Sequence, residues 1–328
     1  MKPKLMKLAA VAVATLLGGC AAPPLAQVAI ACGALGSLVG CDPPDSRYSY
    51  TPPPPTFSKW SDHLNQRDAV RAFGPEVEVP YQRATSGSIG FTGGPGFNQG
   101  VATDLNYSGA DRLVQFRSQY IDLAHAQISP FTGRDGIDAV GDSGSRTDFS
   151  DAPYRQLGLI ANPYKLGWDY QSFGVWNSNG SGASSVIAAS SYGAATPASA
   201  LPATGYATFL GKLAGLYVSP AGEGSMATAD MHVDVNFSTR YVQLVSYNTI
   251  LARGLGASGA PQLDLYGALT YAPGSAGFTG TVKNNGGTMS GTTKGQFYGP
   301  AAEEVGGVFA VKSSTTVETF TGAYGAKR

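Results

Sequence analysis

The clearest pattern in the chain is an alternation of apolar and polar residues in its second half. Over residues 226–237, Ala, Met, Val and Phe occupy every odd position, while Thr, Asp, His and Asn occupy the even positions after Met226. A period of two is typical of a β-strand with one buried and one solvated face. The pattern predicts a long strand, a tight connection at residues 238–240 and a returning strand over residues 241–247.

Further segments repeat this pattern up to the end of the chain. Expected strands cover residues 168–176, 207–218, 263–269, 278–282, 289–297, 308–311 and 320–324, and Asn-Asn-Gly-Gly at 284–287 predicts a hairpin turn. Closing about eight antiparallel strands into a barrel removes exposed sheet edges. We therefore predict an all-β fold in which residues 166–328 form an eight-stranded antiparallel β-barrel. Asp230, Asp234 and Lys283 on its outer faces would be costly against lipid, so we expect it to be soluble.

The alternation is irregular between residues 57 and 165. A short helix is expected at residues 60–66, and strands are expected at residues 77–81 and 112–121. Gly-rich stretches such as residues 90–97 separate these pieces. We interpret residues 57–165 as a small, loop-rich β subdomain.

Composition supports the all-β prediction. The 328 residues include 44 Gly and 21 Pro, and only 13% of residues are charged, whereas 43% are apolar. This apolar fraction is enough for a packed core, and the glycines suit many turns. No basic run suggests nucleic acid as a partner.

The first 19 residues have the features of an export signal. Three lysines precede an apolar run over residues 8–17, which is too short for a permanent membrane span. The run ends in Leu-Gly-Gly-Cys, which resembles a bacterial lipobox with Cys20 as the lipidated residue. Removal of residues 1–19 leaves 19 basic and 22 acidic residues, a net charge of about −3.

Two other cysteines leave the anchor open to a second interpretation. Cys32 and Cys41 are expected to form a small disulfide loop in an oxidising compartment if Cys20 carries the lipid. Alternatively, Leu-Val-Gly-Cys at residues 38–41 makes Cys41 the anchor. In that case Cys20 and Cys32 are lost with the signal. With Cys20 as the lipidated residue, residues 20–56 are expected to form the lipid anchor and tether, and four consecutive prolines at 52–55 make the tether stiff.

Residues 295–309 show a strand, a break at Gly299 and Pro300, a short helical turn, and a second strand. Gly306 and Gly307 are expected to bend the backbone sharply before that second strand. The whole unit is expected to plug the end of the barrel, with Phe297 on one strand face. Glu304 is expected to accept backbone N–H bonds from the turn of the plug.

This stretch resembles the F-Y-G-P-x-A-x-E-x-G-G signature of the barrels in the transferrin-binding protein B family of surface lipoproteins, and it meets every fixed position. The ending G-A-Y-G-A-K-R over residues 322–328 is similar to the end of those barrels, with Tyr324 where Phe is usual. Residues 170–176 resemble their first strand. The three matches together span roughly residues 165 to 328.

The resemblance implies a handle subdomain for residues 57–165 and a lipid-anchored position on the outer membrane of a Gram-negative bacterium. It also implies capture of an iron source, which is a host iron protein, haem or a haem protein, and export through an outer-membrane translocon. An adhesin or host-factor binder without an iron role is the alternative, because barrels of this kind serve many ligands. We expect the first half, with barrel loops such as residues 177–200, to contact the ligand.

The residues suggest no catalytic or cofactor chemistry, so we expect a binding protein and not an enzyme. No nucleophile, paired-carboxylate, zinc or phosphate-loop motif occurs. The histidines are His63, His125 and His232. Asp230, His232 and Asp234 share a strand face but extend over roughly 13 Å, so we expect no metal site there.

Overall fold

The computed structural model describes residues 56–63, 71–83, 88–108, 113–117, 122–130, 134–141, 157–178, 185–253 and 256–328. The expected signal peptide and nearly all of the expected tether lie outside these residues. So do Cys20, Cys32 and Cys41, and the expectations about lipid and disulfide therefore stay predictions. No helix among the described residues is long and apolar enough to span a membrane.

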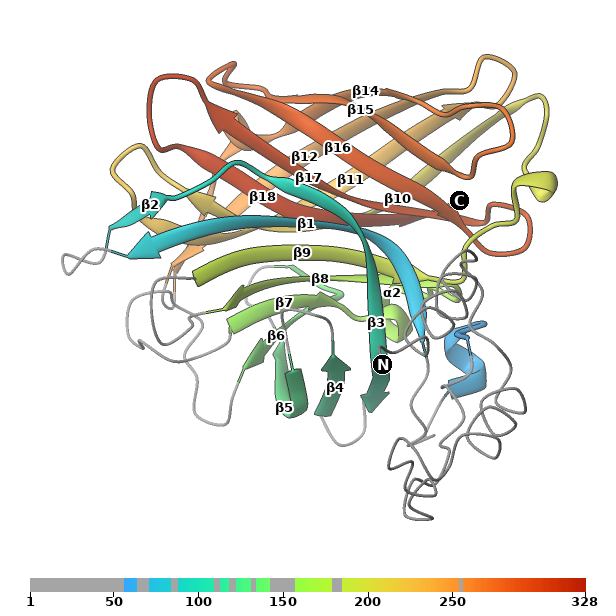
Figure 1. Cartoon of the computed structure of the whole chain (residues 1–328), viewed down its shortest axis with the longest axis horizontal. Coiled ribbons are helices and arrows are strands. Elements are labelled where there is room, and N and C mark those ends of the chain that lie inside the picture. The colour runs from blue at the N-terminus through green and yellow to red at the C-terminus, as the bar shows by residue number, and fades with distance from the viewer. Residues whose placement is uncertain are drawn as a thin grey trace, which may run out of the picture. The chain divides into compact units, whose positions relative to one another are not determined.

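The described residues are almost entirely β-strand (Figure 1). The strands are β1 (Ala72–Arg83), β2 (Ile89–Phe91), β3 (Gly96–Ser108), β4 (Leu113–Arg117), β5 (Asp122–Pro130), β6 (Ile137–Gly141), β7 (Leu157–Ala161), β8 (Gln171–Ser178), β9 (Ser185–Gly193), β10 (Tyr206–Val218), β11 (Gly224–Asn236), β12 (Tyr241–Arg253), β13 (Gly256–Gly259), β14 (Leu265–Thr270), β15 (Gly277–Asn284), β16 (Met289–Tyr298), β17 (Glu304–Ser313) and β18 (Thr319–Lys327). A short α-helix, α2 (Pro163–Leu166), precedes β8, and 3-10 turns η1 (Trp60–His63), η2 (Ala198–Ala200) and η3 (Pro261–Leu263) complete the set.

The second sheet is the predicted eight-stranded antiparallel barrel. Its strands follow the order β11-β10-β18-β17-β16-β15-β14-β12, and β12 pairs with β11 to close the ring. The short β13 pairs with the far end of β12. The long alternating segment is β11, and the Asn-Asn-Gly-Gly sequence forms the turn between β15 and β16, as the sequence predicted.

The first sheet is more extensive than a loop-rich subdomain suggests. Its order is β2-β1-β3-β4-β5-β6-β7-β8-β9, and β9 pairs back onto β1. Strand β1 runs through both Pro75 and Pro80, although the sequence predicted a strand at residues 77–81 only. The helix expected at residues 60–66 is the 3-10 turn η1 over its described part.

The expected boundary between residues 165 and 166 does not coincide with the boundary between the sheets. Strands β8 and β9 belong to the first sheet, and the barrel begins at Tyr206. The reason is that alternation predicts a strand without predicting its partner. The residues around Phe173 have strand periodicity, but their hydrogen bonds go to β7 and β9.

Apolar residues form two separate cores. One fills the barrel and includes Phe209, Leu213, Val233, Leu265, Phe297 and Phe309. The other is a layer between the first sheet and the outer wall of the barrel, with Val77, Phe173 and Ile187 on one side and Leu216, Val308 and Ala323 on the other. Strands β17 and β18 contribute to both cores, which is why nearly every residue in them is buried.

The outer face of β10 shows where the first sheet stops covering the barrel. Leu210 on this face is 59% exposed, whereas Leu216 on the same face is 1% exposed and packs in the layer between the sheets. The outer face of one strand therefore changes from solvent-exposed to buried against the first sheet within six residues. This layer holds the first sheet against β10, β17 and β18.

Candidate functional site

The corner between β16 and β17 carries the signature that the sequence analysis singled out. The chain turns at residues 299–302, where Gly299 has φ 87° and Ala302 has φ 58°. Ala302 is fully buried in the barrel core, so this turn folds inward over the end of the barrel. Phe297 lies just inside, with its ring 5.2 Å from that of Phe278 and 5.4 Å from that of Tyr271.

Two details of the predicted plug are wrong. No helical turn forms at residues 301–304, because β17 begins directly at Glu304. Gly306 and Gly307 lie inside β17 and not at a bend, and the positive φ angles of this stretch belong to Gly299 and Ala302. The sequence suggested a bend because paired glycines permit one, but here they serve close packing.

Both glycines are needed because other groups occupy the space of a side chain. A Cβ on Gly307 would lie 2.5 Å from the carbonyl oxygen of Lys294 and 2.5 Å from the hydroxyl of Tyr324. A Cβ on Gly306 would lie 2.5 Å from Ser191 Oγ and 2.8 Å from Gln171 Oε1. Gly306 therefore gives residues of the first sheet access to the barrel wall.

Glu304 joins the two sheets. Its Oε1 accepts the backbone N–H of Asp169 at 2.7 Å, and its Oε2 accepts that of Tyr170 at 3.0 Å. Both donors precede β8 in the first sheet, so the expectation that Glu304 binds the turn of its own plug is wrong. The sequence could not indicate this partner, which lies more than 130 residues away.

The environment of Glu304 combines burial with one nearby cation. Burial raises the pKa of its carboxyl from the ordinary value of 4.5 to about 7, while the two backbone N–H groups and Lys327 act in the opposite direction. Lys327 Nζ lies 3.9 Å from Glu304 Oε1 and donates to Asp169 Oδ2 at 2.7 Å and to the carbonyl of Gly167 at 2.6 Å. The last strand of the barrel is thus tied to the same segment.

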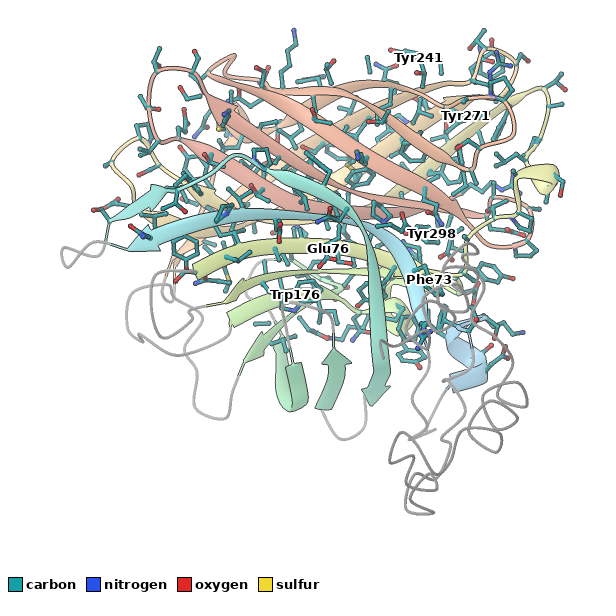
Figure 2. The ribbon with its side chains drawn as sticks, in the orientation of Figure 1. Phe73, Glu76, Trp176, Tyr241, Tyr271 and Tyr298 are labelled. Carbon is teal, nitrogen blue, oxygen red and sulfur yellow. The ribbon has the colours of Figure 1, made fainter. Side chains whose placement is uncertain are left out.

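Tyr298 extends this junction. Its side chain, labelled in Figure 2, is fully buried. Its hydroxyl is 3.0 Å from Ser191 Oγ in β9. Beside it, Gly299 N–H donates to the carbonyl of Ala194, and Thr196 N–H donates to that of Phe297. Residues 177–200 were expected to be a ligand-facing loop, but their described part is mostly β9 and a segment bonded to the plug. The expectation that they form a barrel loop is therefore wrong, and their contact with a ligand stays a prediction.

A groove with a volume of about 660 Å³ lies on the barrel wall, at the opposite end of β16 and β17 from this junction. One side is formed by Val79 of β1 and residues 91–95 between β2 and β3, and the floor by β16 and β17. The turn before β18 forms the other side, where Val317 is 40% exposed. Residues 91–95 belong to the half of the chain that was expected to contact the ligand, whereas no sequence pattern indicated the barrel side of the groove.

Hydroxyl groups and one cation supply the polar part of the described groove. Lys312 is the charged residue of its lining, and no carboxylate lines it among the described residues. The hydroxyl groups belong to Thr92, Ser290, Thr292, Ser313, Thr316 and Thr319. Beside the groove, Lys294 Nζ lies 5.5 Å from the centre of the Phe97 ring, a cation–π contact that joins the sheets.

The row of Asp230, His232 and Asp234 is divided between different partners. Asp230 binds Arg134 at 2.8 Å and Lys212 at 2.7 Å, while His232 Nε2 lies 3.1 Å from Asp234 Oδ1. Among the residues that the structure describes, no group of three or more His, Cys, Asp or Glu could hold a metal ion. Arg134 lies in the turn before β6, so its pair with Asp230 also links the two sheets.

Comparison with known families bears on the second sheet. Residues 201–328 match the family of C-lobe and N-lobe beta barrels of Tf-binding protein B. These residues are a transferrin-binding protein B-type barrel. The match contains the F-Y-G-P signature, the corner at Gly299 and the ending of β18, and its first residue lies close to the start of β10.

Solved structures of this type are similar over much of the chain. A double mutant of transferrin binding protein B from Haemophilus parasuis is 18% identical, with 79% of this chain and 45% of that one covered at a TM-score of 0.43. The isotype 1 protein from Neisseria meningitidis is 17% identical, with 77% and 42% covered at 0.36. The N-lobe domain of lactoferrin binding protein B from Moraxella bovis is 9% identical, with 78% and 99% covered at 0.33.

The chain spans less than half of the length of the Haemophilus parasuis and Neisseria meningitidis proteins. A search of curated proteins finds no match. The transferrin-binding protein B-type barrel is thus defined here by its strand pairing and by the family match over residues 201–328.

Proposed function

We propose that this protein is a lipid-anchored binding protein on the outer surface of a Gram-negative bacterium, where it captures an iron source. The observation that carries the proposal is the transferrin-binding protein B-type barrel over residues 201–328. The similar proteins from Haemophilus parasuis and Moraxella bovis are named for binding transferrin and lactoferrin. A host iron protein is therefore the first ligand to test, followed by haem and haem proteins.

Anchoring is proposed at Cys20, followed by the Pro-rich tether. A lipid anchor holds the folded part at the membrane, and four prolines at residues 52–55 keep that part away from the surface. Export to the outer face would use an outer-membrane translocon. This arrangement suits a protein that meets large ligands outside the cell.

The proposed role is binding without catalysis. The plug residues Phe297, Glu304, Gly306 and Gly307 are explained by packing and by contacts between the sheets, and Gly299 and Pro300 form the turn between β16 and β17. The first sheet supplies the proposed contact surface, because it carries the exposed loop at residues 91–95 on a rigid frame.

A capture experiment with the full chain in detergent tests the function. The immobilised protein is mixed separately with iron-loaded and iron-free transferrin, lactoferrin, haemoglobin and free haem, and retention is measured by mass and by the Soret band. We expect one of these iron sources to be retained. Retention of none of them, together with selective retention of another host protein, would establish the adhesin alternative instead.

A further inference from the structure

Three lysines lie on the outer wall of the barrel around the groove. Lys283 in β15 and Lys312 in β17 both pair with Ser290 in β16, one from each side. Because neighbouring strands are about 4.8 Å apart, the backbones of the two lysines are roughly 10 Å apart with their side chains on one face. Lys294 lies on the same face of β16, four residues from Ser290.

These cations have no acidic partner in the part of the chain that the structure describes. Ion pairs among the described residues join Lys59, Arg134, Lys165, Lys212 and Lys327 to carboxylates, but not Lys283, Lys294 or Lys312. Lys283 and Lys312 are exposed, and Lys294 rests on Phe97. The wall therefore presents a local positive charge on a chain whose net charge after signal removal is negative.

The groove is partly apolar, and of the three lysines Lys312 is part of its lining. Val79, Phe91 and Val317 line it together with the hydroxyl groups. Its volume of about 660 Å³ lies within the range of small-molecule sites, roughly 300 to 1,000 Å³. Apolar walls next to uncompensated cations are complementary to an apolar group that has carboxylates on either side.

The strand pairing restricts how an occupant can bind. Strand β16 is hydrogen-bonded to β15 on one side and to β17 on the other, and β17 is bonded in turn to β18. The floor thus has no free edge to which a peptide could add as a strand. An occupant of this floor is therefore held by side chains, and one that reaches both Lys283 and Lys312 must span roughly 10 Å.

We propose that this groove binds an extended acidic segment of a partner protein, with an apolar side chain in the groove and carboxylates on Lys283 and Lys312. Along an extended chain, residues two to four positions apart are roughly 7 to 13 Å apart, which covers the spacing of the two lysines. A small anion would use Lys312 alone, and an anionic glycan would leave Val79, Phe91 and Val317 unfilled. The inference rests on the proposed binding function and specifies the chemistry of one contact.

The test uses fluorescence anisotropy of the full chain in detergent with two labelled peptides. One alternates Glu and Val, and the other has Gln in place of every Glu. We expect the Glu peptide to bind more tightly, with an affinity that falls as salt increases. Lys312→Gln should weaken binding roughly five- to tenfold, as expected for the loss of a charge-assisted contact, and Lys283→Gln should act in the same direction.

Matched variants separate this site from general charge effects. Lys59→Gln removes an exposed lysine distant in sequence, which is paired with Asp62, and should leave the affinity unchanged. Val317→Ser changes the exposed apolar wall in a surface turn and should weaken both peptides. Equal binding of the Glu and Gln peptides, or unchanged binding by the Lys283→Gln/Lys312→Gln double variant, would overturn the proposal. The proposal would also be overturned if sialyllactose or anionic vesicles displaced the labelled Glu peptide at concentrations where unlabelled Glu peptide does not displace it.

The peptide assay can fail independently of the proposed function. If an iron source is captured normally by the double variant while the Glu peptide does not bind, the groove proposal is wrong and the capture function stands. If the Glu peptide binds through the lysines but no iron source is retained, the groove is correct and the iron role is wrong.

Discussion

Glu304 shows how a single residue can hold a fold together at an energetic cost. Its carboxylate is buried and accepts two backbone N–H groups from the other sheet. Satisfied hydrogen bonds stabilise the position of the side chain, while burial disfavours its charge. The free energy of unfolding of the protein should therefore depend on pH through the protonation of Glu304.

The sign of that dependence follows from a pKa near 7 in the folded protein and 4.5 as its ordinary value. Folding takes up a proton between these values, so stability is greatest below pH 4.5 and falls as the pH rises to about 7. In the parent protein, the free energy of unfolding should fall between pH 5 and pH 8. In Glu304→Gln this fall, measured by urea unfolding, should be smaller by up to about 3 kcal/mol. Glu303→Gln is the control and should keep the dependence of the parent protein. An unchanged slope in Glu304→Gln would show that another group titrates.

A substitution at Gly307 tests whether this glycine is required by close packing. Gly307→Val should destabilise the protein by about 2 to 4 kcal/mol, because even its Cβ would overlap Tyr324 and the backbone of Lys294. Gly277→Ala is a matched change in β15, where a new Cβ would meet nothing closer than 3.7 Å. It should change stability by less than about 1 kcal/mol. Equal melting temperatures for both variants would argue against the contacts described at Gly307.

The lipidated residue is also decided at the scale of one side chain. Cys20→Ala should move the protein from the membrane fraction to the soluble fraction, because the lipobox ends at Cys20. Cys41→Ala should leave it in the membrane. Intact mass measurement of the mature protein gives the direct answer, and acyl chains found on Cys41 would reverse the assignment.

At the scale of elements, strand β10 divides into a covered and an uncovered half. Its inner face packs in the barrel throughout, but only the half around Leu216 also packs against the first sheet. The two halves also differ in sequence, because Thr208 and Lys212 lie on the outer face of the uncovered half, whereas residues 213–218 are apolar on both faces. A continuous apolar run is typical of a strand that is buried on both sides.

Two leucines on that outer face provide a comparison within one strand. Leu216→Ala should cost about 2 to 5 kcal/mol, because it leaves a cavity between the sheets. Leu210→Ala should change stability by less than about 0.5 kcal/mol, since its side chain is 59% exposed. Denaturant midpoints measure both. Similar losses would mean that the first sheet does not cover the barrel as described.

At the scale of the whole molecule, two sheets share one apolar layer and several polar links. Glu304, Lys327 and Arg134 each connect a residue of the barrel with the first sheet or its connections. A barrel expressed alone would expose Leu216, Val308 and Ala323 to water. Binding sites are therefore better located by surface substitutions in the complete chain than by fragments.

Two matched triple variants test which sheet meets the ligand. Thr92→Glu, Asn98→Glu and Gln99→Glu change exposed residues of the first sheet, and Thr239→Glu, Gln243→Glu and Thr270→Glu change exposed residues of the barrel wall away from Lys283 and Lys312. The first triple should reduce capture of the iron source by at least roughly tenfold, because bulky charges block a contact surface. The second should leave capture intact. The reverse result would place the contact on the barrel.

The sequence by itself determined the barrel, because alternation and turn residues are local signals that eight neighbouring strands repeat. It also indicated the corner at Gly299 and the importance of Glu304, since the signature over residues 297–307 occurs in contiguous residues. Only the tertiary structure decided that β8 and β9 join the first sheet, that Glu304 binds residues 169 and 170, and that Lys312 borders a groove. Each of these depends on contacts between segments far apart in the chain, and hydrophobic periodicity carries no information about which partner a strand or carboxylate will meet.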